Sequence, residues 1–477
     1  MIKEIETILK KFRSCFSRKA AFKWFVIIIF GFIVRHDFYG VSSLVRCFSL
    51  ETSYYECLLH FFRADSWNLK IIIKCWIKVI LEECTIVKIN GSQVIISDNI
   101  KVSKEAKKMP GVKKLKQQSA NSNKASYIWG HNFGVISMLI GSDCNYSAIP
   151  VKAELHEDVE KLREFQGKEI PEVKGEKKVT IHTLTVQQAI NIIKITGISG
   201  LLVLDAYFAV SDPFKMSREF IENGKQMLHI ITKGKRHYVG FKKKYNKNDK
   251  LIKGEKIKLK EVFKDKADEF KTKKVYVYGK KEKIKYFTMD LIWGPNNDVI
   301  RFVWVKDGDE TFFLMCSDLT LTPEKIIKAY GYRYKIEVSF KSLKHVIGAF
   351  KYHFWSKELP KLKRKDGKID LNEIKDKTSQ KAIAKTTTAI ERFVNIACIA
   401  LGILQILAFK CPEKIWEQYD GWFRTITSQI PSIETVQNVI KAEFYHPSKE
   451  IKDSLIFKTI KKKQREEKYL YGDDSAA

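Results

Sequence analysis

The chain has 477 residues, which is enough for two or three domains with cores of their own. Hydrophobic residues make up 45% of the sequence, and this fraction excludes an intrinsically disordered chain. The formal net charge of +31 at pH 7 favours a polyanionic partner, although solvated surface alone can explain part of the lysine content. The nine cysteines contain no CxxC pair, so the sequence predicts free thiols in a reducing cytoplasm rather than a disulfide framework or a zinc site.

Residues 1–88 predict a small α-helical domain. Aromatic and aliphatic residues recur there at helical spacing, as in YYECLLHFFR at 54–63. The apolar run WFVIIIFGFIV at 24–34 is too short to cross a bilayer and predicts a buried helix. We therefore expect no membrane association, and the positive charge of the chain makes this domain a candidate for DNA binding.

Residues 89–224 predict the first part of an α/β domain. Strand patterns cover 85–99 (with an Asn-Gly turn at 90–91), 133–141, 146–155 and 201–205. The segment TVQQAINIIKITG at 185–197 has helical spacing and ends on a glycine suited to a helix C-terminus. Three strands, a helix and then a strand are the opening of a ribonuclease-H-like α/β fold.

The remaining chain divides into three predicted segments. Residues 225–320 are lysine-rich with strand patterns and predict a β-rich insertion. Residues 321–410 return to helical patterns, including a strongly apolar helix at 386–409 suited to packing on a sheet. Residues 411–477 predict a helical C-terminal region with a charged tail that frays from about 450.

Two apolar strands each end in an aspartate, with VIIS before Asp98 and LLVL before Asp205. In open α/β sheets, ligands gather at the carboxyl ends of the strands. An aspartate after a strand is also a common turn former or helix cap. Each residue taken alone fits either interpretation.

The stretch YGYRYKIEVSFKSLK at 330–344 carries Tyr330, Arg333, Glu337 and Lys344 at offsets of 0, 3, 7 and 14. On one α-helix these side chains would lie within a sector of roughly 60°. That face is either a functional site or a salt-bridged surface, in which Arg333 and Lys341 pair with Glu337 at i,i+4 spacing.

Two strand-end carboxylates and one carboxylate on a later helix form the ligand set of a two-metal phosphoryl-transfer site. Such hard oxygen ligands suit two ions of magnesium, or of manganese. The cations Arg333 and Lys344 could hold the phosphate. The sequence therefore predicts a metal site formed by Asp98, Asp205 and Glu337.

At this point the sequence resembles a known family. Tyr330-x2-Arg333-x3-Glu337-x6-Lys344 matches, at every position and spacing, the Tyr-Arg-Glu-Lys signature of the insertion-sequence-four family of bacterial DDE transposases. LLVLDAYFA resembles the segment around that family's second aspartate, VIISDNIKVSKEAKKMPGV the segment around its first, and YIWGHNFGVISMLIG the second strand of its sheet. The resemblance covers roughly residues 90–350.

The resemblance implies an RNase-H-like catalytic domain with a β-rich insertion before the catalytic glutamate, preceded by an α-helical N-terminal domain. The catalytic and metal-binding residues would be Asp98, Asp205 and Glu337. The residues that bind the DNA of the transposon ends would be Tyr330, Arg333, Lys341 and Lys344. Some relatives stack a flipped base on a tryptophan just before this motif, where the nearest aromatic residues of this chain are Phe312 and Phe313. Trp293 and Trp304 are the available substitutes. The sequence therefore leaves open whether cleavage passes through a hairpin intermediate.

The implied activity is metal-dependent cleavage at transposon ends, followed by strand transfer into target DNA. Its partners would be double-stranded transposon-end and target DNA, bound by a homodimer in a synaptic complex. The protein would then be cytoplasmic and associated with the nucleoid. Two alternatives remain: an RNase-H-fold nuclease without strand transfer, and a catalytically dead DNA-binding relic.

The net charge generates a first prediction. Binding to duplex DNA should weaken steeply as salt rises, because each neutralised phosphate releases counterions and adds roughly −0.9 to the slope of log K against log salt. A protein that contacts about six phosphates would lose on the order of 10³ in affinity between about 50 and 200 mM salt. A salt titration by fluorescence anisotropy measures this slope, and a slope near zero would contradict a nucleic-acid partner.

Overall fold

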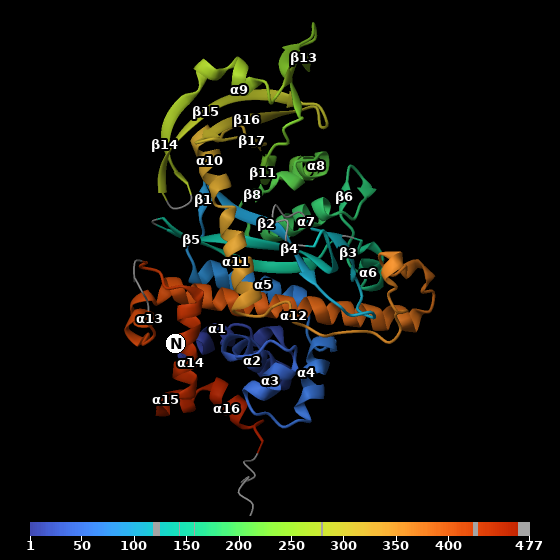
Figure 1. Cartoon of the computed structure of the whole chain (residues 1–477), viewed down its shortest axis with the longest axis vertical. Helices are drawn as coiled ribbons and strands as arrows, with labels where there is room; N and C mark the ends of the chain where they lie inside the picture. The colour runs from blue at the N-terminus through green and yellow to red at the C-terminus, as the bar shows by residue number, and fades with distance from the viewer. Residues whose placement is uncertain (118–124, 143, 157, 278–279, 423–427, 466–477) are drawn as a thin grey trace, which may run out of the picture. The chain divides into compact units, whose positions relative to one another are not determined.

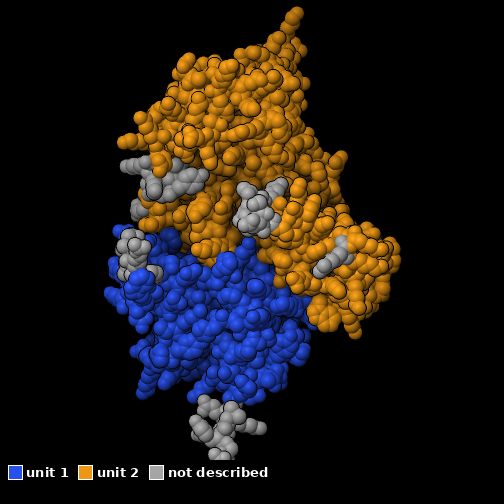
Figure 2. Space-filling view, in the orientation of Figure 1, with its two compact units in different colours: residues 1–75, 343–354, 388–477 blue, residues 76–342, 355–387 orange. Residues whose placement is uncertain are grey.

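A computed structural model of the chain describes residues 1–117, 125–142, 144–156, 158–277, 280–422 and 428–465. The chain divides into two compact units, coloured separately in Figure 2. The first unit contains residues 1–75, 343–354 and 388–477, and the second contains residues 76–342 and 355–387. The five segments predicted from the sequence follow chain order, whereas packing gathers distant segments into one unit.

The first unit is helical. Its helices are α1 (Ile2–Lys10), α2 (Lys19–Val34), α3 (Ser42–Cys47), α4 (Tyr54–Arg63), α13 (Pro412–Gln418), α14 (Ile433–Tyr445), α15 (Lys449–Lys452) and α16 (Leu455–Lys461). The apolar run at 24–34 forms most of α2 and is largely buried, which confirms the predicted buried helix. The tail predicted to fray from about 450 is helical as far as Lys461, because Ile456 and Ile460 of α16 are buried. Residues 466–477 lie outside the described residues.

Three helices continue from one unit into the other: α5 (Leu69–Glu83), α11 (Tyr334–His345) and α12 (Lys377–Lys410). Within the described part of the chain, α12 alone is long and apolar enough to cross a membrane, and 89% of its most apolar stretch is buried inside the protein. The core helices of soluble proteins have the same length and composition, so α12 is weak evidence for a membrane span.

The second unit is built on a 13-stranded mixed sheet, which confirms the predicted α/β class. Its strands are β1 (Lys88–Ile89), β2 (Ser92–Ser103), β3 (Lys113–Lys116), β4 (Tyr127–Ser142), β5 (Asn145–Leu155), β8 (Gly200–Leu204), β11 (Leu228–Lys233), β12 (Val239–Tyr245), β13 (Leu251–Lys258), β14 (Lys271–Val277), β15 (Lys280–Trp293), β16 (Asp298–Asp307) and β17 (Glu310–Cys316). Two small hairpins lie outside it: β6 (Glu172–Val173) with β7 (Glu176–Lys177), and β9 (Ile221–Glu222) with β10 (Lys225–Gln226).

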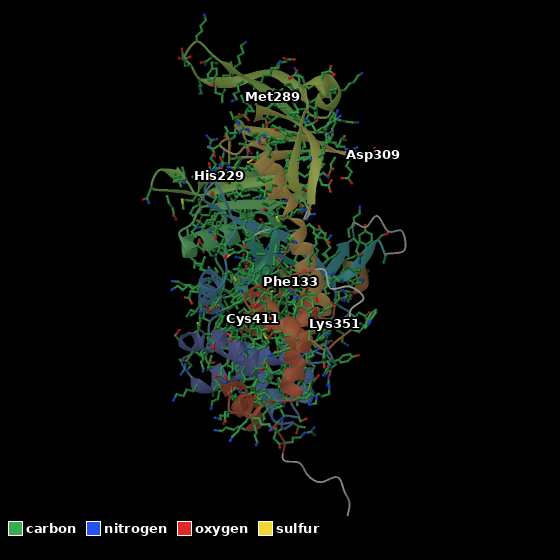
Figure 3. All side chains as sticks on the ribbon, turned by 90° about the vertical axis from the view of Figure 1, so that its left-hand side faces the viewer. Phe133, His229, Met289, Asp309, Lys351 and Cys411 are labelled. Atoms are coloured by element: carbon green, nitrogen blue, oxygen red, sulfur yellow. The ribbon has the colours of Figure 1, made fainter. Side chains whose placement is uncertain are left out.

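The main path of the sheet runs β13-β12-β15-β16-β17-β11-β8-β2-β4-β3, and β5 also pairs with β4. The pairs β2–β8 and β8–β11 are parallel, whereas β2–β4 and β4–β5 are antiparallel. In Figure 3, Met289 of β15, His229 of β11 and Phe133 of β4 mark successive levels of the sheet. The strands at 225–320, which the sequence predicts as an insertion, therefore belong to the same sheet, and the parallel pairing of β11 with β8 joins them to its other strands.

Helices cover both faces of this sheet. On one face, α10 (Pro323–Gly331) buries Ile326 in a cluster that includes Ile96 of β2 and Val203 of β8 (Figure 1). On the other face, α7 (Ile181–Thr196) places Ile193 beside Gly200 and Ile95. The shorter helices of the unit are α6 (Glu160–Phe165), α8 (Ser211–Glu219) and α9 (Val262–Asp265). Strand alternation assigns neighbouring residues of β2 to opposite faces, and this determines which of its polar residues meet α10 and α11.

Two local predictions are confirmed in detail. Asn90 and Gly91 both have positive φ angles, 48° and 81°, and form the two-residue turn between β1 and β2. Helix α7 ends at Thr196 and is capped by Gly197, whose φ of 67° is the left-handed conformation that glycine adopts without strain.

Candidate active site

The parallel register between β2 and β8 brings Asp98 and Asp205 together. Ile96 is the Cα partner of Val203, so two residues further along each chain Asp98 lies at the level of Asp205. Both aspartates share the strand face of Ile96 and Val203, because side chains alternate along a strand. This is the face that carries α10 and the start of α11.

One expectation about Asp98 is wrong. The strand does not end at this residue, since β2 continues to Ser103 and Asp98 pairs with Val135 of β4. The parallel neighbour β8 does end at Leu204, immediately before Asp205. Beyond this level, the strand pairs of β2 that the structure describes are with β4, and Asp98 lies at the end of the parallel pairing rather than at the end of the strand.

The stretch at 330–344 is not one regular helix. Helix α10 ends at Gly331 and α11 begins at Tyr334, and the turn between them uses i→i+3 hydrogen bonds such as Arg333 N–H to the Tyr330 carbonyl, 3.0 Å. Tyr332 and Ile336 face the buried cluster on the sheet. Arg333 and Glu337, one position further on in each case, therefore lie beside that cluster, near the strand ends.

Arg333 contacts two of the predicted carboxylates at once. Its Nη1 donates to Asp98 Oδ2 at 3.0 Å, and its Nη2 donates to Glu337 Oε1 at 2.7 Å. The side chains of Arg333 and Asp98 are only 21% and 19% exposed, whereas that of Glu337 is 47% exposed. Residues 235 positions apart in the sequence thus meet in one ion-pair cluster.

The charges of this cluster are not balanced at Asp98. The pKa of Asp98 is raised to about 7, chiefly by burial and also by the negative charges of Asp205 and Glu337, while Arg333 and the Asn99 N–H oppose the change. Burial opposes the charged form of Arg333, but Tyr330, Asp98 and Glu337 outweigh it and raise the pKa of this guanidinium. One guanidinium therefore faces more negative charge than it can neutralise.

Asp205 also has a local structural role. Its Oδ1 accepts the Tyr207 N–H at 3.0 Å and caps the short 3-10 helix Ala206–Phe208. Burial raises the pKa of Asp205, and the Tyr207 N–H and Arg333 oppose that rise. The cap and the ligand interpretations therefore coexist at this residue, because the cap uses one carboxylate oxygen.

The other signature residues lie on α10 and α11. Tyr330 is half-buried, with its ring centroid 6.3 Å from that of Phe312. Lys341 and Lys344 are exposed on α11. The nearby aromatics divide by burial: Phe313, Trp293 and Trp304 are core residues, whereas Phe312 is partly buried and lies 4.9 Å from the Lys233 ammonium. The two tryptophans are thus unsuited to stacking a base.

Sequence reasoning missed the polar residues behind Asp98. Asn99 donates its backbone N–H to Asp98 Oδ1 at 2.7 Å, and its side-chain oxygen lies 3.2 Å from His156 Nδ1. No spacing pattern marks either residue. The one available signal was the alternation of β2, which directs Asn99 away from the face of Asp98 and toward α7.

Asp98, Asp205 and Glu337 have the hard oxygen donors that magnesium or manganese prefers. Their arrangement is not that of a finished metal site, since no three His, Cys, Asp or Glu residues within the described ranges form a group that could hold an ion. The ion pairs explain this, because the Arg333 guanidinium lies between Asp98 and Glu337. The donor set and its excess negative charge fit a divalent cation, provided that Arg333 moves aside.

Comparisons with protein-family models and with curated protein sequences find no match to this chain.

The raised pKa of Asp98 generates a second prediction. Unfolding lowers this pKa toward its ordinary value of 3.8, so the folded state holds the proton more tightly. The resulting stabilisation is complete below about pH 4 and is lost as the pH rises to about 7, amounting to at most about 4 kcal/mol. Urea unfolding of the metal-free protein from pH 4 to 8 should show this loss relative to Asp98→Asn, which removes the titration. Parallel pH profiles for the two proteins would contradict the assignment.

Proposed function

We propose that the chain is a DDE-type DNA transposase of the insertion-sequence-four kind, which cleaves DNA at transposon ends and transfers the freed strand into target DNA. The observation that carries the proposal is the double ion pair of Arg333 with Asp98 and Glu337. It joins the signature stretch to the first of the two strand aspartates, which were singled out independently. A surface salt bridge between Arg333 and Glu337 alone would not require Asp98 to lie there.

The sheet supports an RNase-H-like fold for this domain. The strands β2, β4 and β5 are successive antiparallel neighbours, α7 follows, and β8 returns parallel to β2. This is the opening sequence of elements that such a fold requires. The next strand, β11, adds on the other side of β8 and is also parallel.

The proposed chemistry assigns each residue a defined task. Asp98, Asp205 and Glu337 would hold two divalent cations, magnesium or manganese. When bound, such a pair activates the attacking oxygen and stabilises the leaving oxygen of an in-line phosphoryl transfer. Arg333, drawn away from the carboxylates, would pair with a DNA phosphate through two parallel N–H donors. Tyr330, Lys341 and Lys344 would bind the same DNA backbone near the reacting phosphate.

The remaining charge suits a DNA partner of considerable length. Strands β12 and β13 carry exposed lysines at 242, 243, 244, 253, 256 and 258. Such a basic surface tracks a phosphate backbone without reading sequence. Because two transposon ends must be joined, we further propose a homodimer in the synaptic complex, acting on the bacterial nucleoid in the cytoplasm.

Two assays test the proposal. Nicking of a labelled transposon-end duplex with manganese separates an active enzyme from a DNA-binding relic. Joining of the cut end to a target plasmid then separates a transposase from a nuclease without strand transfer. The DNA that flanks the gene supplies the end sequences for both assays. Cleavage without joining would favour the alternative function, a nuclease without strand transfer.

The third prediction concerns Glu337. Its side chain is half-exposed, so Glu337→Gln should change the stability of the metal-free protein by less than about 1 kcal/mol. Cleavage should fall by several orders of magnitude, and the stabilisation that manganese gives should shrink, because that gain follows metal affinity. Melting curves with and without manganese, run beside the nicking assay, measure both effects. Wild-type nicking in this variant would return Glu337 to the role of a surface ion-pair partner.

The fourth prediction concerns competition at Arg333. Arg333→Gln removes the guanidinium that lies between Asp98 and Glu337, so manganese affinity without DNA should rise by roughly fivefold to tenfold, as expected for an ion pair of about 1 kcal/mol. Affinity for end DNA should fall in the same variant. Calorimetric titration with manganese and anisotropy with DNA measure the two changes.

A matched control is available in the same unit. Arg301 forms a similar pair with Asp290, with Nε and Nη2 at 2.8 and 2.9 Å from the two carboxylate oxygens. Arg301→Gln should leave manganese affinity unchanged. If Arg333→Gln also left it unchanged, the guanidinium and the metal would not compete for the same carboxylates.

A further inference from the structure

A chain of polar groups leads from the half-buried Asn99, behind Asp98, into the protein interior on the sheet face opposite to the carboxylates. Asn99 Oδ1 lies 3.2 Å from His156 Nδ1, and His156 Nε2 lies 3.4 Å from Gln188 Nε2. Gln188 Nε2 also donates to Glu154 Oε2 at 3.1 Å. His156 and Glu154 are only 1% and 3% exposed. This chain of polar groups therefore joins β2 to β5 and α7 through the protein interior.

The hydrogen bonds of this chain have one consistent direction. The Gln188 amide nitrogen can only donate, so the ring nitrogen facing it, His156 Nε2, must accept. Burial lowers the pKa of His156 to about 3, which leaves the ring neutral with a single N–H. That N–H is on Nδ1 and donates to Asn99 Oδ1. The tautomer of His156 is thus set by Gln188.

Glu154 anchors the far end of the chain. Its two oxygens accept from Arg163 Nη1 at 2.6 Å, Lys168 Nζ at 3.0 Å and Lys152 Nζ at 2.8 Å. Burial opposes the charged form of Glu154, but these three cations lower its pKa well below the ordinary value. The carboxylate is therefore ionised and held from several directions, which makes it a rigid origin for the hydrogen bonds.

The sheet provides the space that His156 needs. Gly134 of β4 pairs with Asn99 on one side and with Glu154 on the other. A Cβ atom at Gly134 would lie 1.8 Å from His156 Cε1. Only glycine leaves room for the imidazole above the sheet at this row, directly across from Asn99.

Asp98 lies where the parallel pairing of β2 with β8 ends, so another contact must fix the position of its carboxylate. Asn99 supplies one, since its backbone N–H donates to Asp98 Oδ1 while its side chain is held by His156. We propose that His156 is a positioning residue for Asp98, acting through Asn99 from the opposite face of the sheet. The inference rests on the proposed function, in which Asp98 holds a metal ion. Partners of this kind orient a ligand without contacting the substrate.

Two substitutions of His156 separate positioning from simple stability. His156→Leu keeps most of the volume and removes the N–H, so manganese affinity and the nicking rate should each fall about 10- to 100-fold while the affinity for end DNA stays unchanged. His156→Asn is smaller and should be the less stable variant, because it leaves a cavity. It retains an N–H near the position of Nδ1, and it should therefore bind manganese and nick DNA better than His156→Leu.

His131 offers a matched control in the same sheet. It is fully buried, and its Nε2 lies 2.9 Å from the Pro110 carbonyl. His131→Leu should lower the melting temperature and leave manganese affinity unchanged. Asn99→Ala covers the case in which a His156 variant does not fold, because Asn99 is only half-buried. This replacement removes the acceptor of the His156 N–H. It should therefore weaken manganese binding in the same way as His156→Leu.

The outcomes are distinct. If manganese affinity follows melting temperature across these variants, or is unchanged in His156→Leu, the inference is overturned even though the wild type cleaves DNA. If manganese binding weakens in His156→Leu but the wild type does not cleave DNA, the proposed function fails and the positioning role stands. A wild type that binds no manganese would overturn both, since no ligand would then require positioning.

Discussion

The parallel pairing of β2 with β8 sets the position of the charged groups at the candidate site. It places Asp98 and Asp205 at one level of the sheet, and strand alternation directs both side chains to the face covered by α10 and α11. The two helices are held on that face by apolar residues such as Ile326 and Ile336. Arg333 and Glu337 are brought to the aspartates by this packing, because they adjoin the buried positions of the same helical stretch.

The cost of this arrangement is electrostatic. Two carboxylates with limited exposure lie side by side, and a third joins them through one guanidinium. Like charges at this range destabilise each other unless a cation or a proton neutralises them. The folded chain supplies Arg333 and a raised proton affinity at Asp98, and under the proposed function a divalent cation would replace both. The carboxylates are thus partly neutralised by groups of the chain itself, and negative charge remains.

Local patterns in the sequence predicted those features that depend on local physics. The Asn-Gly turn at 90–91, the buried helix at 24–34 and the helix C-terminus at Gly197 all follow from neighbouring residues. The continuation of β2 past Asp98 depends on pairing with β4, which no local pattern contains. The break between α10 and α11 was missed because helical spacing persists across it, while the buried contacts of Tyr332 and Ile336 determine the turn.

The sequence also could not identify the groups that support the site. His156 and Gln188 are isolated polar residues in their own segments, and their relation to Asn99 exists only once β2, β4, β5 and α7 have assembled. Likewise, the helical unit combines both ends of the chain, and only long-range packing specifies such a combination.

The close approach of Gly134 and His156 has a consequence for how this chain can change over evolutionary time. A methyl group at position 134 has no space unless the ring at position 156 becomes smaller, and a smaller residue at 156 leaves a void that a larger one at 134 could fill. Substitutions at the two positions are therefore coupled: related chains should keep both residues or replace both. A lineage that lost the histidine would be free to lose the glycine, and under the proposed positioning role the pair would then record when the requirement at Asp98 was relaxed.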